Sequence, residues 1–312
     1  MLITGIGGPG GIAVAESLRK ADHAKYYLLG VDCDPYAPGR VMVDDFSPIP
    51  PAVDDGFVAS LLRVSKGFDA LFCTVDEELP KVSSYAKEFE CKVFVSPFKA
   101  VATCLDKFKT FKALRRAGIP VPNTIPYKLG VKGTLEAFDY PLIVKPRHGR
   151  GSRNIFKVAS RRELEAVGQI TGNMEMLIQE YVEGPEYTVD VLANEKSELV
   201  ACVPRERIRI RTGLTIVGRT VKNGRFTELA EKIAKTLELK YIFNFQCRGV
   251  DLKVTEVNPR PSGTMILSTM AGVNMPKILL EEELKPKAYL DKFKENVWLY
   301  RNLNNYVVVE QV

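Results

Sequence analysis

Two oxygen-bearing side chains, Glu256 and Asn258, stand two residues apart near the end of the chain. On a β-strand, residues two apart project from the same face. Carboxylate and amide oxygens are the ligand type that Mg²⁺ requires. Arg260 follows, flanked by two prolines that restrict where this phosphate-binding cation points. The spacing predicts a magnesium and phosphate site; the alternative is a strand end that leads into a polar turn.

A preceding strand adds a third oxygen ligand. Residues 241–246 and 252–258 are expected to form a hairpin whose turn is centred near Asp251. In that register Gln246 lies opposite Glu256, and Asn244 lies opposite Asn258. Directly opposed residues are about 5 Å apart. We therefore expect Gln246, Glu256 and Asn258 to form one cluster able to share metal ions.

A glycine-containing loop, residues 147–153, follows an apolar run that ends in Lys145. Residues 155–158 are expected to return as a strand, which makes the loop the tip of a hairpin. Glycines let the backbone approach phosphates closely, and cations attract a polyanion. The segment contains four cations: Lys145, Arg147, Arg150 and Arg153. His148 is interpreted as a loop residue rather than as a catalytic base.

Two readings fit residues 176–191, where an apolar strand ends at Glu180 and a second strand resumes at Glu186. One reading is an ordinary hairpin with surface acids, turned at residues 184–185. The other is an adenosine slot, in which the backbone at 180–182 meets the base. Glu186 then accepts hydrogen bonds from ribose hydroxyls.

Residues 203–222 are unusually basic, and four of their arginines alternate: Arg205, Arg207, Arg209 and Arg211. On a strand these share one face. A solvated basic face and a wall for phosphates and an anionic substrate are both compatible with the pattern. Nucleic acid fits less well, because no aromatic residues are interleaved. Three acids at another strand end are expected to border the same cleft and to recognise an amine: Asp76, Glu77 and Glu78.

Residues 1–95 predict a small parallel α/β sheet that precedes these motifs. Strands are expected at 1–4, 27–31, 70–74 and 92–96, with a helix at 12–21. The glycine-rich turn 5–11 and the acids after the second strand are typical of a dinucleotide-binding fingerprint. The alternative is a tight strand-to-helix turn. An amphipathic helix is expected at 106–118, with Lys107 near its start.

Length and composition limit the class of protein. The 312 residues exceed one comfortable hydrophobic core, and 46% hydrophobic with 26% charged residues is ordinary for a globular chain. The net charge of +6 suits small anionic ligands. The six cysteines are scattered, which predicts neither a zinc site nor a disulfide framework and favours a reducing cytoplasm. We expect no membrane span and no signal peptide.

Taken together, these motifs resemble the ATP-grasp superfamily, most closely the modules of carbamoyl phosphate synthetase large subunits and single-chain amino-acid ligases. The resemblance covers nearly the whole chain. It implies an α/β and α+β fold in which a Rossmann-like pre-ATP-grasp domain precedes a two-lobed ATP-grasp fold. The implied boundaries are 1–95 for the first domain, 96–178 for the small lobe with the glycine loop, and 179–312 for the C-terminal lobe with the Mg²⁺ site.

The resemblance also implies roles for individual residues. Lys107 and Lys145 match basic residues that contact ATP phosphates, and Arg260 matches the arginine near the transferred phosphoryl group. Lys145 and Arg260 are thereby the implied catalytic pair. The implied nucleotide contacts also include these residues: Gly149, Gly151, Ser152, Glu180, Tyr181, Val182, Glu186 and Arg211. Gln246, Glu256 and Asn258 match Mg²⁺ ligands, with Mn²⁺ as an alternative metal. Many relatives have a carboxylate where Gln246 stands, and this neutral ligand lowers the charge of the site.

The implied activity is ATP-dependent ligation of a carboxylate, activated as an acylphosphate, to an amine or ammonia. The expected partners are small carboxylate and amine substrates, an amino acid among them, with no nucleic acid and no membrane; a homodimer is left open. Three alternatives remain. They are phosphorylation of bicarbonate or carbamate, a non-catalytic ATP-binding module, and an NAD-dependent oxidoreductase that uses the glycine turn at 5–11.

Overall fold

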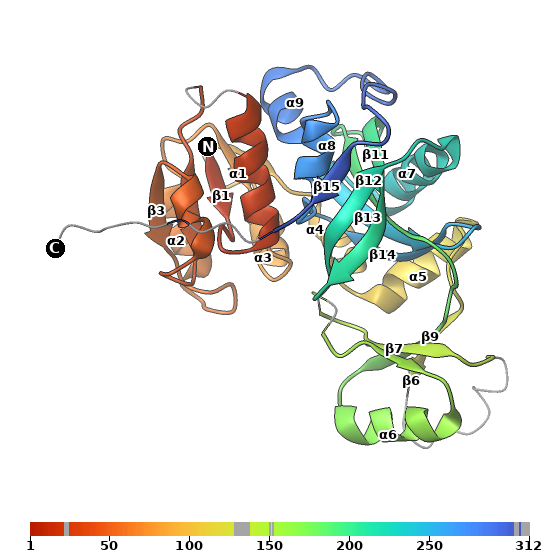
Figure 1. Cartoon of the computed structure of the whole chain (residues 1–312). Coiled ribbons are helices and arrows are strands. Elements are labelled where there is room, and N and C mark those ends of the chain that lie inside the picture. The colour runs from red at the N-terminus through yellow and green to blue at the C-terminus, as the bar shows by residue number, and fades with distance from the viewer. Residues whose placement is uncertain (22–24, 128–137, 150, 152, 303–305, 307–312) are drawn as a thin grey trace.

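The computed structural model describes residues 1–21, 25–127, 138–149, 151, 153–302 and 306. Three β-sheets organise them, and Figure 1 shows the sheets as separate layers with helices packed against them. The five-stranded sheet lies at the left of the view, the six-stranded sheet beside it, and the four-stranded sheet with its helix below. The mixed α/β and α+β class expected from the sequence is confirmed.

The N-terminal sheet has the strand order β3-β2-β1-β4-β5, and all of its pairs are parallel. Its strands are β1 (Leu2–Thr4), β2 (Leu29–Asp32), β3 (Asp45–Pro48), β4 (Ala70–Phe72) and β5 (Lys92–Phe94). Its helical segments are α1 (Pro9–Ala21), η1 (Pro38–Met42), α2 (Phe57–Val64) and α3 (Leu79–Ser84). The predicted parallel sheet is confirmed; the edge strand β3 was not anticipated.

Other residues of the first domain pack against the turn between β1 and α1 and fill the space around it. Gly5 has φ +59°, and a Cβ added to it would lie 2.1 Å from Val75 Cγ2. The amide of Gly7 donates to Asp32 Oδ2 at 2.8 Å. A Cβ on Gly7 would also lie 3.1 Å from the Ala37 Cβ, because the chain after β2 packs on the turn. Asp32, the last residue of β2, therefore fixes the conformation of the turn.

The four-stranded sheet has the order β6-β9-β7-β8, all antiparallel. Its elements are β6 (Thr124–Tyr127), β7 (Leu142–Pro146), β8 (Phe156–Val158), β9 (Met176–Glu180) and α6 (Arg161–Thr171). The predicted hairpin around the glycine loop is confirmed by the β7–β8 pairing. Two helices precede this sheet, α4 (Phe98–Cys104) and α5 (Lys107–Arg116). The side chain of Asp106 caps α5, as it accepts from the amides of Phe108 and Lys109 at 3.0 and 3.1 Å.

The six-stranded antiparallel sheet has the order β14-β13-β10-β11-β12-β15. Its strands are β10 (Glu186–Ala193), β11 (Leu199–Arg211), β12 (Leu214–Thr220), β13 (Tyr241–Arg248), β14 (Lys253–Asn258) and β15 (Trp298–Tyr300). The helices around it are α7 (Gly224–Leu237), α8 (Ile266–Met270) and α9 (Met275–Glu281). Buried residues of α1 share one core with α9 and with β11, so the first domain packs directly on this sheet.

The structure rules out one open reading and corrects one expectation about strands. β9 and β10 belong to different sheets, so residues 176–191 are a crossing between sheets and not a hairpin. The turn is held by Gly184, where a Cβ would lie 3.1 Å from the Cα of Gly249. The alternation of arginines is broken by register shifts in β11 between Arg207 and Arg209 and between Arg209 and Ile210.

The described residues contain no helix that is long and apolar enough to cross a membrane. The segment 303–312 lies outside the described residues apart from Tyr306. The domain boundaries at residues 95 and 178 stay predictions.

Candidate active site

The hairpin of β13 and β14 brings the three expected metal ligands together. Gln246 lies opposite Glu256, and Asn244 opposite Asn258, which confirms the predicted register. Asn258 Nδ2 donates to Asn244 Oδ1 at 3.2 Å, and Asn244 Nδ2 donates to the carbonyl of Arg260 at 2.9 Å. This chain of amides orients Asn258, whose Nδ2 acts as a hydrogen-bond donor. The Oδ1 atom of Asn258 is therefore the atom available to a cation.

The same sheet face continues across β10 and β11. Thr188 lies opposite both Gln246 and Arg205, which extends the row of Glu256 across two more strands. Asp190 lies opposite Asn244 and so extends the row of Asn258. Opposed residues in a sheet project from one face. Polar and charged groups that are distant in sequence therefore line one continuous surface.

Lys145, at the end of β7, is a buried cation held by neutral groups. Its ammonium donates to Gln179 Oε1 at 2.9 Å and to the carbonyl of Thr255 at 3.0 Å. Burial lowers the pKa of Lys145 to about 8, against the opposing effect of Glu256. A buried ammonium with neutral acceptors gains most from an anion placed beside it.

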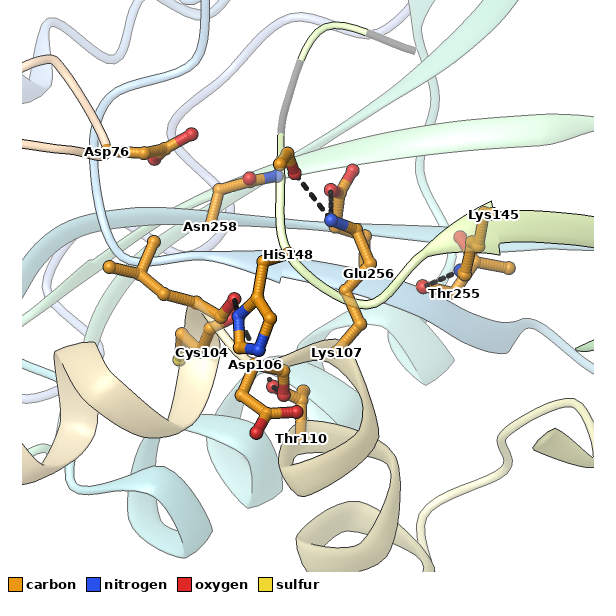
Figure 2. Close-up of polar contacts among 12 residues, drawn as sticks. Asp76, Cys104, Asp106, Lys107, Thr110, Lys145, His148, Thr255, Glu256 and Asn258 are labelled. Carbon is orange, nitrogen blue, oxygen red and sulfur yellow. Dashed lines mark hydrogen bonds and ion pairs between the residues drawn. The ribbon is translucent and has the colours of Figure 1, made fainter. Parts of the chain in front are cut away.

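Lys107 begins α5 and points at the metal-ligand hairpin, as Figure 2 shows. Its ammonium lies 3.8 Å from Glu256 Oε1 and donates to the carbonyl of Gly149 in the glycine loop. The loop is anchored beside it, since Arg147 Nε and Nη2 donate to the two oxygens of Asp106 at 2.9 and 2.6 Å. Burial raises the pKa of Asp106, but the hydrogen bonds from Arg147 and the amide of Lys109 outweigh it and lower the pKa to about 2.

Arg260 is paired with the first domain. Its Nε and Nη2 donate to the two oxygens of Asp76 at 2.6 and 3.0 Å, and its Nη1 donates to the carbonyl of Pro261 at 3.1 Å. Asp76 follows β4, so the contact joins the five-stranded and six-stranded sheets. Glu78, expected to border the cleft, instead accepts a hydrogen bond from Thr4 in the first domain.

Two cavities meet at the metal-ligand hairpin. The first, named here the inter-sheet cavity, has about 380 Å³ and lies between the four-stranded and six-stranded sheets. Lys107, Lys145 and Gly149 line it, together with Gln179, Glu186, Arg207, Gln246 and Glu256. Glu186 is already engaged there, because it accepts from Arg207 Nη1 at 2.5 Å.

The second cavity, named the glycine-turn cavity, has about 200 Å³ and lies between the turn of the first domain and the six-stranded sheet. Its lining includes Gly8, Gly10, Thr188, Arg205, Arg207, Gln246, Glu256, Asn258, Arg260 and Ser262. Arg207, Gln246 and Glu256 therefore line both cavities. A group transferred between ligands in the two cavities would pass these side chains.

Other predicted contacts lie further out. Glu180 and Tyr181 follow Gln179 but are not among the residues that line the inter-sheet cavity, and neither is Val182. The carboxylate of Glu180 is paired with Lys253, and Lys157 Nζ lies 3.9 Å from the ring centroid of Tyr181. Ser152 lies outside the described residues, whereas Gly151 lines the glycine-turn cavity. The roles of these residues stay predictions.

Arg211 is exposed and lines neither cavity, whereas Arg207 is buried and lines both. Sequence reasoning named Arg207 only as one of four alternating arginines, and it missed Gln179 and the partnership of Asp76 with Arg260. The alternating arginines signalled a basic strand, but the pattern carries no information on which of them are buried. Only the neighbouring strands decide that.

The donor set at the hairpin suits a hard cation. Gln246, Glu256 and Asn258 offer amide and carboxylate oxygens on one face, and Mg²⁺ and Mn²⁺ both accept such ligands. Among the described residues, no three His, Cys, Asp or Glu side chains gather with metal-binding spacing. With one carboxylate in the set, a bound cation would take further ligands from water or from a phosphorylated substrate.

Comparisons with known proteins identify families and relatives that are similar to this chain. Residues 173–302 match the family described as "ATP-grasp in the biosynthetic pathway with Ter operon". Residues 111–215 match the family described as "D-ala D-ala ligase C-terminus". The carbamoyl phosphate synthase large chain of Caldanaerobacter subterraneus subsp. tengcongensis is 27% identical over 227 residues, which are 67% of this chain and 21% of that protein. The chain thus spans about a fifth of the length of that relative.

Two solved structures share the fold. N5-carboxyaminoimidazole synthetase from Staphylococcus aureus, complexed with ADP, has a TM-score of 0.69 at 17% identity and covers 92% of this chain and 78% of its own. The L-amino acid ligase from Bacillus licheniformis has a TM-score of 0.68 at 19% identity and covers 91% and 74%. At these identities the likeness concerns the fold.

Proposed function

Because the chain is a member of the ATP-grasp superfamily, we propose that it is an ATP-dependent carboxylate–amine ligase that forms a C–N bond and releases ADP and phosphate. The two family matches, the fold shared with an L-amino acid ligase and the two cavities that meet at Glu256 support this proposal. Its substrates are a small carboxylic acid and an amine or ammonia.

The observation that carries the proposal is the surroundings of Lys145. A buried ammonium that contacts only neutral acceptors in Gln179 and Thr255 is suited to receive an anion. It faces the inter-sheet cavity beside Lys107, and that cavity is large enough for part of a nucleotide. We assign the phosphates of ATP to this end of the cavity, under the loop that contains Gly149.

Gln246, Glu256 and Asn258 are proposed to hold Mg²⁺, or Mn²⁺ in its place. When bound, such a cation would neutralise phosphate charge during phosphoryl transfer. Lys107 lies 3.8 Å from Glu256, so its ammonium can hold a phosphate oxygen next to the same site. Arg260 adds a further cation at the wall of the glycine-turn cavity.

The reaction then needs no nucleophile from the protein. A carboxylate oxygen of the acid attacks the γ-phosphorus, the bond to the β-phosphate oxygen breaks, and ADP leaves. The amine nitrogen attacks the acyl carbon of the resulting acylphosphate, phosphate departs with the bonding pair, and the amine proton passes to solvent. Lys145, Lys107 and Arg260 stabilise the charge on the transferred group, and exclusion of water protects the acylphosphate.

A side cavity of about 230 Å³ offers a route for the amine. Asp76, Glu77, Lys107, His148, Glu256 and Asn258 are among its lining residues. It therefore reaches the metal-ligand wall from a third direction, and Figure 2 shows Asp76, Lys107 and His148 around Glu256 and Asn258. Acids on its wall favour a cationic amine over an anion.

The alternatives lose support at particular residues. An NAD-dependent oxidoreductase would need a glycine turn that is open to the dinucleotide. Here Asp32 accepts a hydrogen bond from the amide of Gly7, and Ala37 packs on the turn. A module that only binds ATP has no use for a second cavity against Glu256. Phosphorylation of bicarbonate or carbamate is retained as the second candidate, because several of the sequence relatives are carbamoyl phosphate synthase large chains.

The test is ADP release from Mg-ATP with pools of amino acids and small acids, with and without ammonium, and with bicarbonate alone. We expect a pool to stimulate wild-type release and Glu256→Gln to lower it on the order of 100-fold. The matched control is Glu228→Gln, an exposed glutamate on α7, which should release ADP as the wild type does. Stimulation by bicarbonate alone would replace the ligase with the second candidate, and no ATP binding would refute both.

We place this activity in the cytoplasm, as the described cysteines are all free and five of the six are buried. A homodimer is the assembly we propose, supported by the stacked and exposed rings of Trp298 and Tyr300 on edge strand β15. Trp298→Ser together with Tyr300→Ser should convert a dimer to a monomer in light scattering. A monomeric wild type would refute the dimer.

A further inference from the structure

Arg205 on β11 has a buried nitrogen that its own chain leaves unmatched. The residue is 1% exposed. Nε donates to Asp190 Oδ2 at 2.8 Å, and Nη2 donates to Asp190 Oδ1 at 2.9 Å and to Ser262 Oγ at 2.8 Å. Within the described part of the chain, Nη1 has no hydrogen-bond partner.

The orientation of this guanidinium is fixed by its partners. Asp190 also accepts a hydrogen bond from Ser268 Oγ at 2.6 Å, which fixes the orientation of the carboxylate that binds Arg205. An arginine has five N–H groups. Nε uses one and Nη2 uses two, which leaves both N–H groups of Nη1 unused. Buried charged donors are costly to leave unmatched, so the geometry calls for an acceptor from outside the chain.

Arg205 lines the glycine-turn cavity, where such an acceptor can bind. The volume of about 200 Å³ exceeds the roughly 30 Å³ share of one water several-fold, so there is room for a small organic acid. The charged side chains that line this cavity are three arginines and Glu256. Glu256 faces the expected cation, so the remaining wall favours an anion.

Position along the sheet separates this acceptor from the group that is phosphorylated. Arg205 donates hydrogen bonds to Asp190 on β10. Asp190 lies opposite Asn244 on β13, and Asn244 lies opposite Asn258 on β14. Two strand spacings, roughly 10 Å, therefore separate the backbone beside the guanidinium from the backbone of Asn258. A carboxylate bound to this guanidinium therefore lies beside β10, two strands away from β14, which carries Glu256 and Asn258.

We propose that the glycine-turn cavity binds a second carboxylate, one that is not phosphorylated, through Nη1 of Arg205. The inference rests on the proposed ligase function and deepens it by naming a substrate class. The second carboxylate belongs either to a dicarboxylic acid, as its far end, or to an amino acid that acts as the amine. Arg205 is the residue that makes the enzyme select substrates with this group.

The experiment compares matched substrates that differ only in that carboxylate. In the first arm, succinate, glutarate and adipate are compared with propionate, butyrate and valerate, with ammonium as the amine. In the second arm, the same monocarboxylates are offered glycine or methylamine. Turnover is measured as ADP release and binding by calorimetry in the presence of Mg-ADP, for wild type, Arg205→Lys and the exposed control Arg209→Lys.

We expect the carboxylate-bearing member to be preferred about 100-fold in one of the two arms, which identifies the source of the group. Arg205→Lys keeps a charge for Asp190 but lacks Nη1, so the preference should fall to a few-fold, while Arg209→Lys retains it. If Arg205→Lys does not fold, as judged by circular dichroism, the proposal is tested by the wild-type preference for carboxylate-bearing substrates alone.

The two proposals fail separately. Equal turnover of both members of every pair keeps the ligase and overturns the second-carboxylate site. Selective binding that Arg205→Lys abolishes, without ADP release in any arm, supports the site and refutes the ligase. Absence of any preference in both binding and turnover overturns the site, and Nη1 would then face only buried water.

Discussion

Arg260 and Asp76 form a two-pronged ion pair, 2.6 and 3.0 Å long, between residues that are 184 positions apart. Both side chains are largely buried, with 17% and 12% exposed. The pair joins the sheet that carries the metal ligands to the first domain. The N–H groups of Arg260 that neither Asp76 nor the carbonyl of Pro261 engages are the ones available to a ligand.

The first prediction concerns this pair. Asp76→Asn keeps the shape but removes the charge that orients Arg260, so ADP release should fall about 10-fold or more. The free energy of unfolding, measured with urea, should fall by about 1–3 kcal/mol. Asp55→Asn, at an exposed acid of the same domain, is the control and should change neither. Unchanged turnover in Asp76→Asn would show that Arg260 needs no such orientation.

A second prediction concerns the pH dependence of nucleotide binding. The ammonium of Lys145 has a pKa of about 8, so its charge is lost as the pH rises through that value. ATP affinity, measured by calorimetry, should therefore fall above pH 8. Lys145→Arg stays charged and should bind with little change up to pH 9.5, and Lys109→Arg, at an exposed lysine of α5, should retain the wild-type decline.

The same lysine has an effect on stability with the opposite sign. Its pKa is 10.5 in the unfolded chain and about 8 in the folded one, so unfolding takes up a proton between these values. The free energy of unfolding should therefore rise with pH across that window, by an amount on the order of 3 kcal/mol. Lys145→Met should remove the rise in urea titrations at pH 7.5 and 10. An equal rise in Lys145→Met would assign it to another group.

Asp106 should make the fold sensitive to acid. The pKa of this carboxyl is about 2 in the folded chain against 3.8 unfolded, so its contribution is present above pH 3.8 and is lost as the pH falls toward 2. Its size is about 2 kcal/mol. Asp106→Asn keeps a cap for α5 but loses the pairing with Arg147, whereas Asp106→Ala loses both. Urea unfolding at pH 7 should therefore rank wild type, Asn and Ala in decreasing stability.

Gly249 tests the close approach of the two turns. With φ at +76°, an added Cβ would lie 2.8 Å from Val182 Cγ1 and 2.9 Å from the Glu183 carbonyl oxygen. Gly249→Ala should lower the free energy of unfolding by about 1–3 kcal/mol and raise the KM for ATP, because it displaces the crossing between the sheets. Gly224→Ala, at the first turn of α7 with open space around it, should be neutral or stabilising. Equal behaviour of the two variants would contradict this reading.

A further prediction concerns the neutral metal ligand. Gln246→Glu adds a second carboxylate opposite Glu256, so half-maximal ADP release should need several-fold less Mg²⁺. Gln169→Glu, at an exposed glutamine of α6, is the matched control and should leave the Mg²⁺ dependence unchanged. An unchanged requirement in Gln246→Glu would remove Gln246 from the metal site.

The sequence by itself determined the features that depend on local patterns. The alternation of residues and one turn near Asp251 were enough to pair Gln246 with Glu256, because a hairpin register follows from its turn. The parallel sheet of the first domain and the start of α5 beside Asp106 likewise follow from short-range periodicity and capping.

The tertiary structure decided what depends on distant neighbours. Arg205 and Arg209 are indistinguishable in the alternating pattern, yet one is buried against Asp190 and the other is exposed, because bulges in β11 end the shared face. The pairing of Asp76 with Arg260 and the crossing from β9 to β10 arise when three sheets pack together. Burial and long-range ion pairs are properties of that packing, so no local periodicity encodes them.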